Sequence, residues 1–267
     1  MTTAVIRPLV LGHRGASAEA PENTLAAFDL ALRQGADGIE FDVRLSADGV
    51  PVVIHDARLE RTTSGKGRVD ERDARELGRL DAGDRFNRRH PVRARAKYAG
   101  LRIPLLSETL DWVKERGCLA YVELKRERSS NTGLEEKVLS AIESAGVARQ
   151  VVIISFHPAV LERVRRQDSS VTLGLDCTRP LAAIRKAQAA GASVVLPLAA
   201  LVSRYFIERA HARGLQVVPW GAETPRAWRR LLASGVDGLI TNRPAALRRL
   251  AESATVAPRH AEVVESR

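Results

Sequence analysis

Two histidines and two closely spaced carboxylates lie within the first 60 residues of the chain. His13 and His55 each follow a short apolar run, and Glu40 and Asp42, in the apolar segment 38–45, are expected at the end of a strand. Side chains two positions apart on a strand point to the same side, so these carboxylates share one face. Histidine transfers protons near neutral pH, and paired carboxylates bind divalent cations. These residue types are the parts of a metal-assisted phosphodiester hydrolase.

The carboxylate pair needs a positive partner, because the residues that alternate with it along the segment are apolar. Ordinary salt bridges to Arg14 or Arg44 are one solution, and a divalent ion is the other. A third carboxylate at the end of an apolar run, Glu123, favours a hard-oxygen site for Mg²⁺ or Ca²⁺. Zinc is a weaker alternative in which His13 turns inward as a ligand.

A repeated strand-then-helix unit is expected to position these side chains. A glycine ends each helical stretch a few residues before the next apolar run, at Gly35, Gly117, Gly146, Gly191, Gly214 and Gly235. Apolar runs centred near residues 10, 40, 123, 151, 171, 194, 217 and 239 give eight strands. This alternation predicts a (β/α)₈ TIM barrel, with a doubly wound open sheet as the rival fold. In such a barrel the active site lies at the C-terminal ends of the strands, so the candidate residues would converge there.

The domain plan has one large unit and two irregular segments. At 267 residues and 45% hydrophobic content, the chain is expected to form one domain over residues 1–253, followed by a flexible tail over 254–267. Residues 57–104 interrupt the rhythm and are interpreted as an insertion over the catalytic face, with a short helix near 70–80. Cys118 and Cys177 are expected to be small buried residues.

Charge and targeting signals narrow the choice of partners. Neither a membrane-spanning run nor a signal-peptide pattern is recognisable, so a cytoplasmic protein is expected. The net charge is +10, and basic residues crowd the second half of the insertion, namely Arg85, Arg88, Arg89, Arg93, Arg95, Lys97 and Arg102. One hypothesis is that they steer an anionic substrate or touch anionic lipid head groups, and the alternative is a solvated loop. Nucleic-acid binding is disfavoured because only two aromatic side chains accompany this charge. The oligomeric state is not predicted.

Several short motifs, taken in order, resemble those of the glycerophosphodiester phosphodiesterases. Those before residue 70 are His13-Arg14-Gly15, Pro21-Glu22-Asn23-Thr24, Glu40-Phe41-Asp42, His55-Asp56, Leu59–Thr63 and Gly65–Gly67. Those further along are Val122–Lys125, Ser155-Phe156, Trp220 and Gly235–Pro244. The resemblance extends from about Leu11 to Leu250, and the ordered set is far more specific than any single motif.

The resemblance implies a TIM barrel that hydrolyses deacylated phospholipids to sn-glycerol 3-phosphate and an alcohol with a divalent cation. The implied metal ligands are Glu40, Asp42 and Glu123. The implied acid-base pair is His13 and His55, with His13 as the guess for the base. Arg14 and Lys125 would offset phosphate charge, and Trp220 would be a wall for the glycerol moiety. Direct attack by water and a cyclic phosphate intermediate both remain open.

A few positions depart from the family pattern, one of them a conservative change in Ile103-Pro104-Leu105-Leu106, where Ile-Pro-Thr-Leu is usual. After Trp220 a threonine and, two residues later, an asparagine are usual, but this chain has Gly221-Ala222-Glu223. The Glu223 carboxylate could alter substrate preference or cap the following helix.

Two alternative functions also remain open beside the leading one. The first keeps the chemistry but directs it at lysophospholipids or phosphoinositide-like diesters. The second is a catalytically silent phosphate-binding barrel, which is disfavoured because both histidines and all three carboxylates are present.

Overall fold

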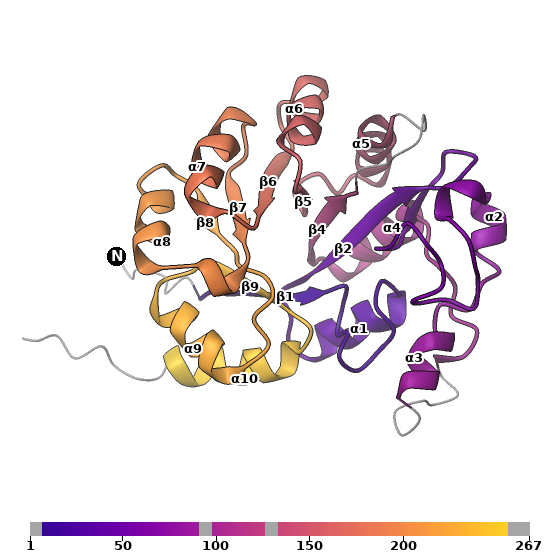
Figure 1. Cartoon of the computed structure of the whole chain (residues 1–267), viewed down its shortest axis with the longest axis horizontal. Helices are drawn as coiled ribbons and strands as arrows, with labels where there is room; N and C mark the ends of the chain where they lie inside the picture. The colour runs from indigo at the N-terminus through magenta and orange to yellow at the C-terminus, as the bar shows by residue number, and fades with distance from the viewer. Residues whose placement is uncertain (1–6, 91–97, 126–132, 256–267) are drawn as a thin grey trace, which may run out of the picture.

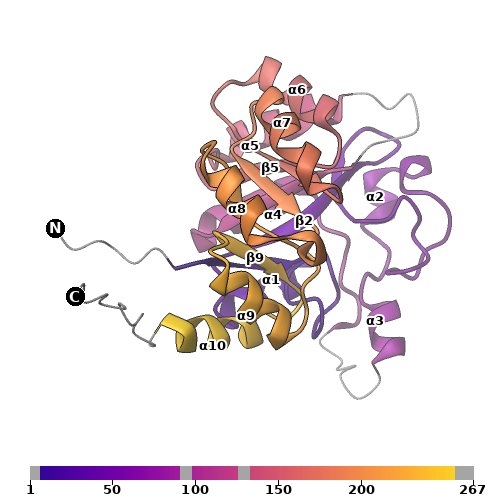
Figure 2. The same ribbon diagram turned by 60° about the vertical axis from the view of Figure 1, so that its left-hand side comes forward.

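Eight parallel strands form a nearly closed barrel with helices outside it (Figure 1, Figure 2). The computed structural model describes residues 7–90, 98–125 and 133–255. The barrel strands are β1 (Leu9–His13), β2 (Gly38–Leu45), β4 (Leu119–Leu124), β5 (Val151–Ser155), β6 (Thr172–Cys177), β7 (Val194–Pro197), β8 (Gln216–Val217) and β9 (Gly238–Thr241). They follow the order β8-β7-β6-β5-β4-β2-β1-β9. The (β/α)₈ prediction is therefore confirmed.

The barrel closes between β8 and β9, where the pairing is sparse. β8 is a two-residue strand, and no ladder joins it to β9 in the described sheet. Two backbone hydrogen bonds of 3.0 Å cross this seam, from the Asp237 amide to the Val217 carbonyl and from the Ile240 amide to the Pro219 carbonyl. The first and last strands, β1 and β9, are by contrast paired over four residues.

The barrel helices are α1 (Leu25–Arg33), α4 (Leu106–Arg116), α5 (Leu134–Ala145), α6 (Pro158–Gln167), α7 (Pro180–Ala189), α8 (Arg204–His211), α9 (Pro225–Ala233) and α10 (Pro244–Thr255). Their ends follow ordinary capping chemistry. Thr24 and Thr224 cap α1 and α9 by accepting a bond from a backbone amide, and Gly117 and Gly146 end α4 and α5 in the left-handed conformation.

Strand residues alternate between two cores. One set of side chains, including Val10 and Leu175, faces the helices. The other set fills the barrel interior and comprises Leu11, Tyr121, Val152, Ile154, Val194, Leu196, Val218 and Ile240. Because the period of a strand is two, each strand supplies both cores, and the polar residues above the inner core point into the barrel mouth.

The segment after β2 contains elements that the sequence pattern did not predict. A short strand, β3 (Pro51–Val53), pairs antiparallel with the second half of β2. It is followed by η1 (Val69–Glu71), α2 (Ala74–Leu77) and α3 (Asp84–Arg89), so the expected helical piece near 70–80 is present and α3 is additional. β3 also corrects one expectation, because Glu40 and Asp42 lie within β2 and not at its end. The strand continues to Leu45 since its last residues bond to β3.

Two of the sequence predictions concern segments that lie partly outside the described residues. Arg93, Arg95 and Lys97 lie outside the described residues. The helix α10 runs to Thr255, two residues into the stretch expected to be a tail, and residues 256–267 also lie outside. Both cysteines are buried, as expected. No helix in the described ranges has the length and apolar character that crossing a membrane requires.

Candidate active site

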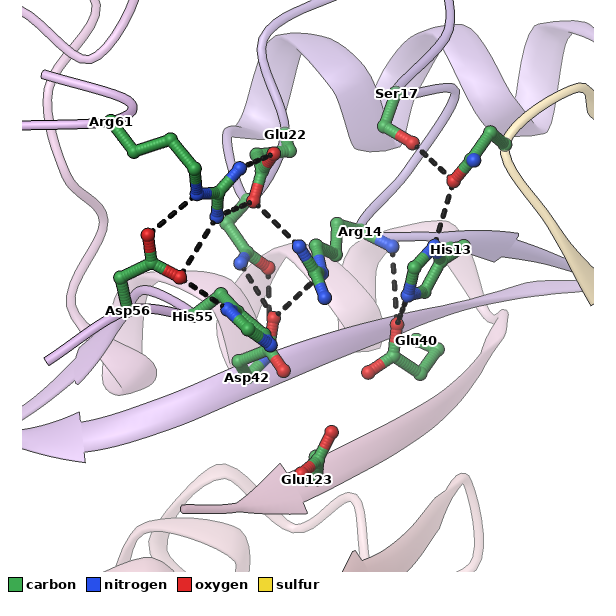
Figure 3. Close-up of polar contacts among 12 residues, drawn as sticks. His13, Arg14, Ser17, Glu22, Glu40, Asp42, His55, Asp56, Arg61 and Glu123 are labelled. Carbon is green, nitrogen blue, oxygen red and sulfur yellow. Dashed lines mark hydrogen bonds and ion pairs between the residues drawn. The ribbon is translucent and has the colours of Figure 1, made fainter. Parts of the chain in front are cut away.

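Three carboxylates from adjacent strands converge at the barrel mouth (Figure 3). Glu40 and Asp42 come from β2 and Glu123 from β4, and oxygen atoms of all three lie within 4.8 Å of one another. Lys125 bridges two of them, with its Nζ 2.9 Å from Asp42 Oδ1 and 2.6 Å from Glu123 Oε1. The register explains the meeting, because Asp42 and Glu123 are direct neighbours across the β2–β4 ladder.

The Arg14-Gly15 turn that follows β1 aims the Arg14 guanidinium at this cluster, next to the His13 ring at the end of β1. Arg14 has a φ of 54° and Gly15 a φ of 85°, and a Cβ at Gly15 would lie 2.5 Å from the Ala27 carbonyl carbon. Only glycine fits that approach. The turn is fixed by the Arg14 amide, which donates to the Glu40 carbonyl at 2.8 Å and to Glu40 Oε2 at 3.2 Å.

The Arg14 guanidinium joins the carboxylate cluster to a second acidic residue. Its Nε lies 3.1 Å from Asp42 Oδ2, and its terminal nitrogen donates to Glu22 Oε1 at 2.8 Å. Asn23, with a left-handed φ of 56°, donates from Nδ2 to the same Asp42 oxygen at 2.8 Å. The salt bridge that the sequence left open as an alternative to a metal is thus formed by Arg14 with Asp42. Arg44 instead donates to the His55 carbonyl oxygen.

His13 lies beside Glu40 (Figure 3). Its ring also contacts Asn242, which directly follows the last barrel strand, β9. Its Nδ1 lies 2.7 Å from Asn242 Oδ1, which also accepts a bond from Ser17 Oγ at 2.8 Å. The hydroxyl and the imidazole Nδ1–H both donate to this oxygen, so Nε2 is left with its lone pair, 3.9 Å from Glu40 Oε2. Burial, followed by the Arg14 charge, lowers the pKa of His13 to about 4.

His55 lies beside Asp42 and belongs to a different network. Its Nδ1 is 2.5 Å from Asp56 Oδ1, and Arg61 Nε is 2.5 Å from the other oxygen of Asp56. Arg61 also binds Glu22 through two nitrogens, at 2.6 and 2.8 Å. Burial lowers the pKa of His55, while the Asp42 carboxylate opposes that shift. The pKa of Asp56 falls to about 2 because the bonds from Arg61 and His55 outweigh its burial.

Glu223, one of the departures from the family pattern, lies behind His13. Its two oxygens accept the Thr241 hydroxyl at 3.1 Å and the Asn242 amide at 2.9 Å. The cap of the following helix is Thr224 and not Glu223. The carboxylate therefore fixes the backbone that carries Asn242, the partner of His13.

The electrostatics of the carboxylate cluster favour a bound cation. Burial and then the Asp42 charge raise the pKa of Glu40 well above its usual value, and the same causes raise that of Glu123 to about 7. Burial opposes ionisation of Asp42 too, but Lys125 and Arg14 lower its pKa. Three oxygen donors whose negative charge is only partly compensated fit a hard divalent cation. Glu40, Asp42 and Glu123 would hold it.

A pocket of about 120 Å³ opens beside this cluster. Its apolar wall contains Ile154, Phe156, Trp220 and Ile240. The Phe156 and Trp220 rings pack edge to face, with their centroids 5.7 Å apart. The Trp220 indole nitrogen donates to the Leu196 carbonyl at 3.0 Å, which fixes its ring. The polar lining comprises His13, Arg14, Glu40, His55, Glu123, Lys125 and Asp176.

All eight residues singled out in the sequence lie around this pocket, Asp42 through its contacts with Arg14 and Lys125. Sequence reasoning missed the groups that hold them, namely Ser17, Glu22, Asn23, Arg61 and Asn242, and it missed Asp176. Glu22, Asn23, Arg61 and Asn242 lie inside the motifs quoted above, but no spacing rule links them to their partners. A buried acid in the apolar run of β6 was the available signal for Asp176.

The fold and the site define a phosphodiesterase-type TIM barrel, and comparisons with known proteins agree. The model of the glycerophosphoryl diester phosphodiesterase family matches residues 13–246. A glycerophosphodiester phosphodiesterase of Caldanaerobacter subterraneus subsp. tengcongensis is 34% identical over 246 residues, covering 91% of this chain and 97% of that protein. The chain belongs to the glycerophosphodiester phosphodiesterase family and is an enzyme of that class.

Solved structures of relatives share the whole architecture. A glycerophosphodiester phosphodiesterase of Agrobacterium tumefaciens is 31% identical with a TM-score of 0.77, over 91% of this chain and 99% of that chain. A phosphodiesterase of Oleispira antarctica, solved in complex with its product sn-glycerol-3-phosphate, is 28% identical with a TM-score of 0.80, over 92% and 97% of the two chains.

Proposed function

We propose that this enzyme cleaves glycerophosphodiesters to sn-glycerol 3-phosphate and an alcohol through acid-base catalysis by His13 and His55. The observation that carries the proposal is the carboxylate cluster lying between the two histidines, with His13 beside Glu40 and His55 beside Asp42 (Figure 3). The product complex of the Oleispira relative supports the choice of product. The pocket of about 120 Å³ suits a glycerol moiety better than an acyl chain, which disfavours lysophospholipids.

The phosphodiester carries a negative charge that repels a nucleophile, and the chain supplies fixed cations against it. Arg14 and Lys125 both line the pocket and are held in place by their ion pairs with Asp42. Because they are oriented before substrate arrives, they stabilise the charge that develops in the transition state without reorganising. A Mg²⁺ or Ca²⁺ ion bound by the three carboxylates would polarise the phosphoryl oxygens and add to this effect.

His13 is suited to act as the general base. Its Nδ1–H donates to the Asn242 oxygen, so the lone pair on Nε2 is available for the proton of an attacking hydroxyl. The attacking group is water or a hydroxyl of the substrate itself. The low pKa of His13 keeps the ring neutral and ready to accept a proton at neutral pH.

His55 is suited to act as the general acid. Its Nδ1 faces the Asp56 carboxylate, and this contact favours the imidazolium form against the burial that lowers the pKa of the ring. Nε2 of that form then gives its proton to the departing alkoxide. Asp56 is itself ionised and held by Arg61, so the dyad keeps its orientation while the proton moves.

A pair of leaving groups tests these roles. Ethanolamine leaves as a basic alkoxide that needs a proton, whereas p-nitrophenolate leaves without one. We expect His13→Ala to slow release from both sn-glycerol 3-phosphate diesters by roughly 10²–10⁴-fold, the usual contribution of a general base. His55→Ala should slow ethanolamine release to a similar extent and p-nitrophenolate release far less.

The assay is run after chelation and again with Mg²⁺ or Ca²⁺ restored, and His90→Ala serves as a control because His90 ends α3 away from the pocket lining. Equal losses in His55→Ala with both leaving groups would refute the acid role. Full activity in the presence of chelator would refute the metal requirement. The cytoplasmic location, the lipid contact and the steering role of the basic loop stay predictions.

A further inference from the structure

Asp176 is a buried carboxylate in the pocket wall that the proposed mechanism does not use. It lies on β6, where Leu175 and Cys177 face the helices and the alternation turns Asp176 toward the barrel interior. Its side chain lines the pocket while the residue is 5% exposed, and its Oδ2 atom has no hydrogen-bond partner among the residues that the structure describes. It does not belong to the group of three carboxylates whose oxygens meet.

A buried carboxyl oxygen without a partner is costly, so its retention in a pocket wall indicates a partner that arrives with the substrate. Burial, followed by the Glu123 charge, raises the pKa of Asp176 well above its usual value. Both protonation states of the carboxyl can bond to a hydroxyl group, since the ionised form accepts and the neutral form accepts or donates.

The surroundings of Asp176 select a neutral polyol. Arg14 and Lys125 line the same pocket as Glu40 and Glu123, and a divalent cation held by those carboxylates would leave a positive balance of charge that disfavours an ammonium head group there. Phe156 and Trp220 offer apolar faces to carbon-bound hydrogens, so Asp176 is the hydrogen-bonding group of this wall apart from the catalytic residues. The volume of about 120 Å³ suits a three-carbon polyol.

We propose that Asp176 binds a hydroxyl group of the glycerol moiety through its free Oδ2 and thereby selects glycerol esters over plain alkyl esters. This assignment rests on the proposed function and names a determinant of its substrate preference. The order β6-β5-β4-β2-β1 places Asp176 across the barrel from His13, so the glycerol arm would lie between the inner wall and the acid-base groups. A site built to bond a hydroxyl rejects an analogue that lacks it, because the buried polar atom stays unpaired.

Two substrates with the same leaving group test the proposal. Glycerophosphoethanolamine carries both glycerol hydroxyls, and propyl phosphoethanolamine carries neither, and ethanolamine release is measured for both. We expect Asp176→Ala to lower kcat/KM for the glycerol ester by about tenfold to a hundredfold, as for a lost bond to a charged group. If water attacks, the propyl ester should be hydrolysed at nearly the same rate by the wild type and the variant. If a glycerol hydroxyl attacks, both proteins leave the propyl ester intact, and the binding titration of the two products decides instead.

Asp176→Asn keeps the size and one oxygen acceptor, so it should retain part of the preference and guards against a folding defect in the alanine variant. Asp168→Asn, a change at a half-buried position directly after α6 and outside the pocket lining, is the matched control. Calorimetric titration of sn-glycerol 3-phosphate and propyl phosphate, each with Mg²⁺ or Ca²⁺ present, gives a readout apart from turnover. We expect only the affinity for the glycerol product to fall in Asp176→Ala.

Failure of the proposed function and failure of the Asp176 assignment give different results in these experiments. A wild type that leaves glycerophosphoethanolamine intact under every ion condition refutes the proposed function. An active wild type whose Asp176→Ala variant loses the same factor on both esters refutes the assignment of Asp176, because the residue would then act only on structure or on the metal ligands. A variant that keeps the wild-type preference for glycerol refutes it as well.

Discussion

Asn242 Oδ1 lies 2.7 Å from Nδ1 of His13, although 229 positions separate the two residues in the chain. The contact ties the first barrel strand to the turn after the last one. Because the amide oxygen accepts from Nδ1–H, the orientation and the tautomer of His13 are set together. Glu223 supports this contact by accepting the Asn242 backbone amide.

Asn242→Asp should shift the pH profile of the enzyme. An anionic partner stabilises the protonated ring, so the pKa of His13 rises from about 4 in the wild type. A base is lost as the pH falls below its pKa, and the acidic limb of kcat/KM should therefore move to higher pH. The measurement is kcat/KM for glycerophosphoethanolamine between pH 4 and pH 8 with saturating divalent cation.

Asn242→Ala is the counterpart of that variant. It removes the hydrogen bond, which raises the pKa of His13 in the wild type, so the acidic limb should not move upward. Activity should instead fall at every pH because the ring is no longer oriented. An unchanged profile in Asn242→Asp would show that His13 does not supply the acidic limb.

Metal-free protein should lose stability as the pH rises, and Glu123 should contribute to that loss. Its pKa is raised from 4.5 to about 7 in the folded state, so the folded protein holds a proton that the unfolded chain releases. The free energy of unfolding should therefore fall between about pH 4.5 and pH 7, by about 3 kcal/mol for this group at one pKa unit per 1.4 kcal/mol. Urea titrations in chelator at pH 5 and pH 7.5 measure the difference.

Glu123→Gln provides the comparison. The variant should show a shallower decline with pH, because an amide does not ionise. A steeper decline would place the ionisation elsewhere in the cluster.

Divalent cations should stabilise the folded enzyme only while the three carboxylates are present. Ligand binding to the folded state adds about 2.7 kcal/mol at a hundredfold excess over Kd. We expect the wild-type melting temperature to rise with added Mg²⁺ or Ca²⁺, and Glu40→Gln to lose most of that rise. In chelator, Glu40→Gln should melt at or above the wild type since a costly buried acid is gone. A full metal response in Glu40→Gln would contradict its role as a ligand.

Arg61→Ala should weaken the acid half of the site. Arg61 holds Asp56 and Glu22 at once, and Glu22 in turn contacts Arg14. Without Arg61, neither Asp56 beside His55 nor Glu22 beside Arg14 is held in position. We therefore expect kcat to fall by roughly tenfold or more. Arg58→Ala is the control, since Arg58 pairs with Glu60 on the surface. Equal activity in the two variants would contradict the supporting role of Arg61.

The barrel could be predicted because its signals are local. Continuous apolar runs and the glycines that end helices give the eight strands without reference to distant residues. β3 was not predicted because three residues are too few to show the two-residue alternation of a strand. Its pairing with β2 extends the strand that carries Glu40 and Asp42. That the carboxylates converge could be predicted because the parallel barrel strands meet at one mouth, although Glu40 and Asp42 lie within β2 and not at its end.

The supporting groups of the site could not be predicted in the same way. Asn242 and Arg61 meet their partners only through the tertiary fold, and hydrogen-bond geometry has no sequence period. Asp176 lies in an apolar strand where its inward direction depends on the register between β6 and its neighbours. Specific pairings of this kind need coordinates, whereas the residue types of the reaction do not.

The sparse seam between β8 and β9 makes the orientation of His13 depend on one flank of the last strand. β9 forms a four-residue ladder with β1 but is joined to β8 by two backbone hydrogen bonds, and Asn242 directly follows β9. Because the Asn242 amide orients His13 from this position, a substitution that loosens the β1–β9 ladder should lower turnover while the carboxylates on β2 and β4 keep their places. In a refolding experiment we expect turnover to recover no earlier than tryptophan fluorescence.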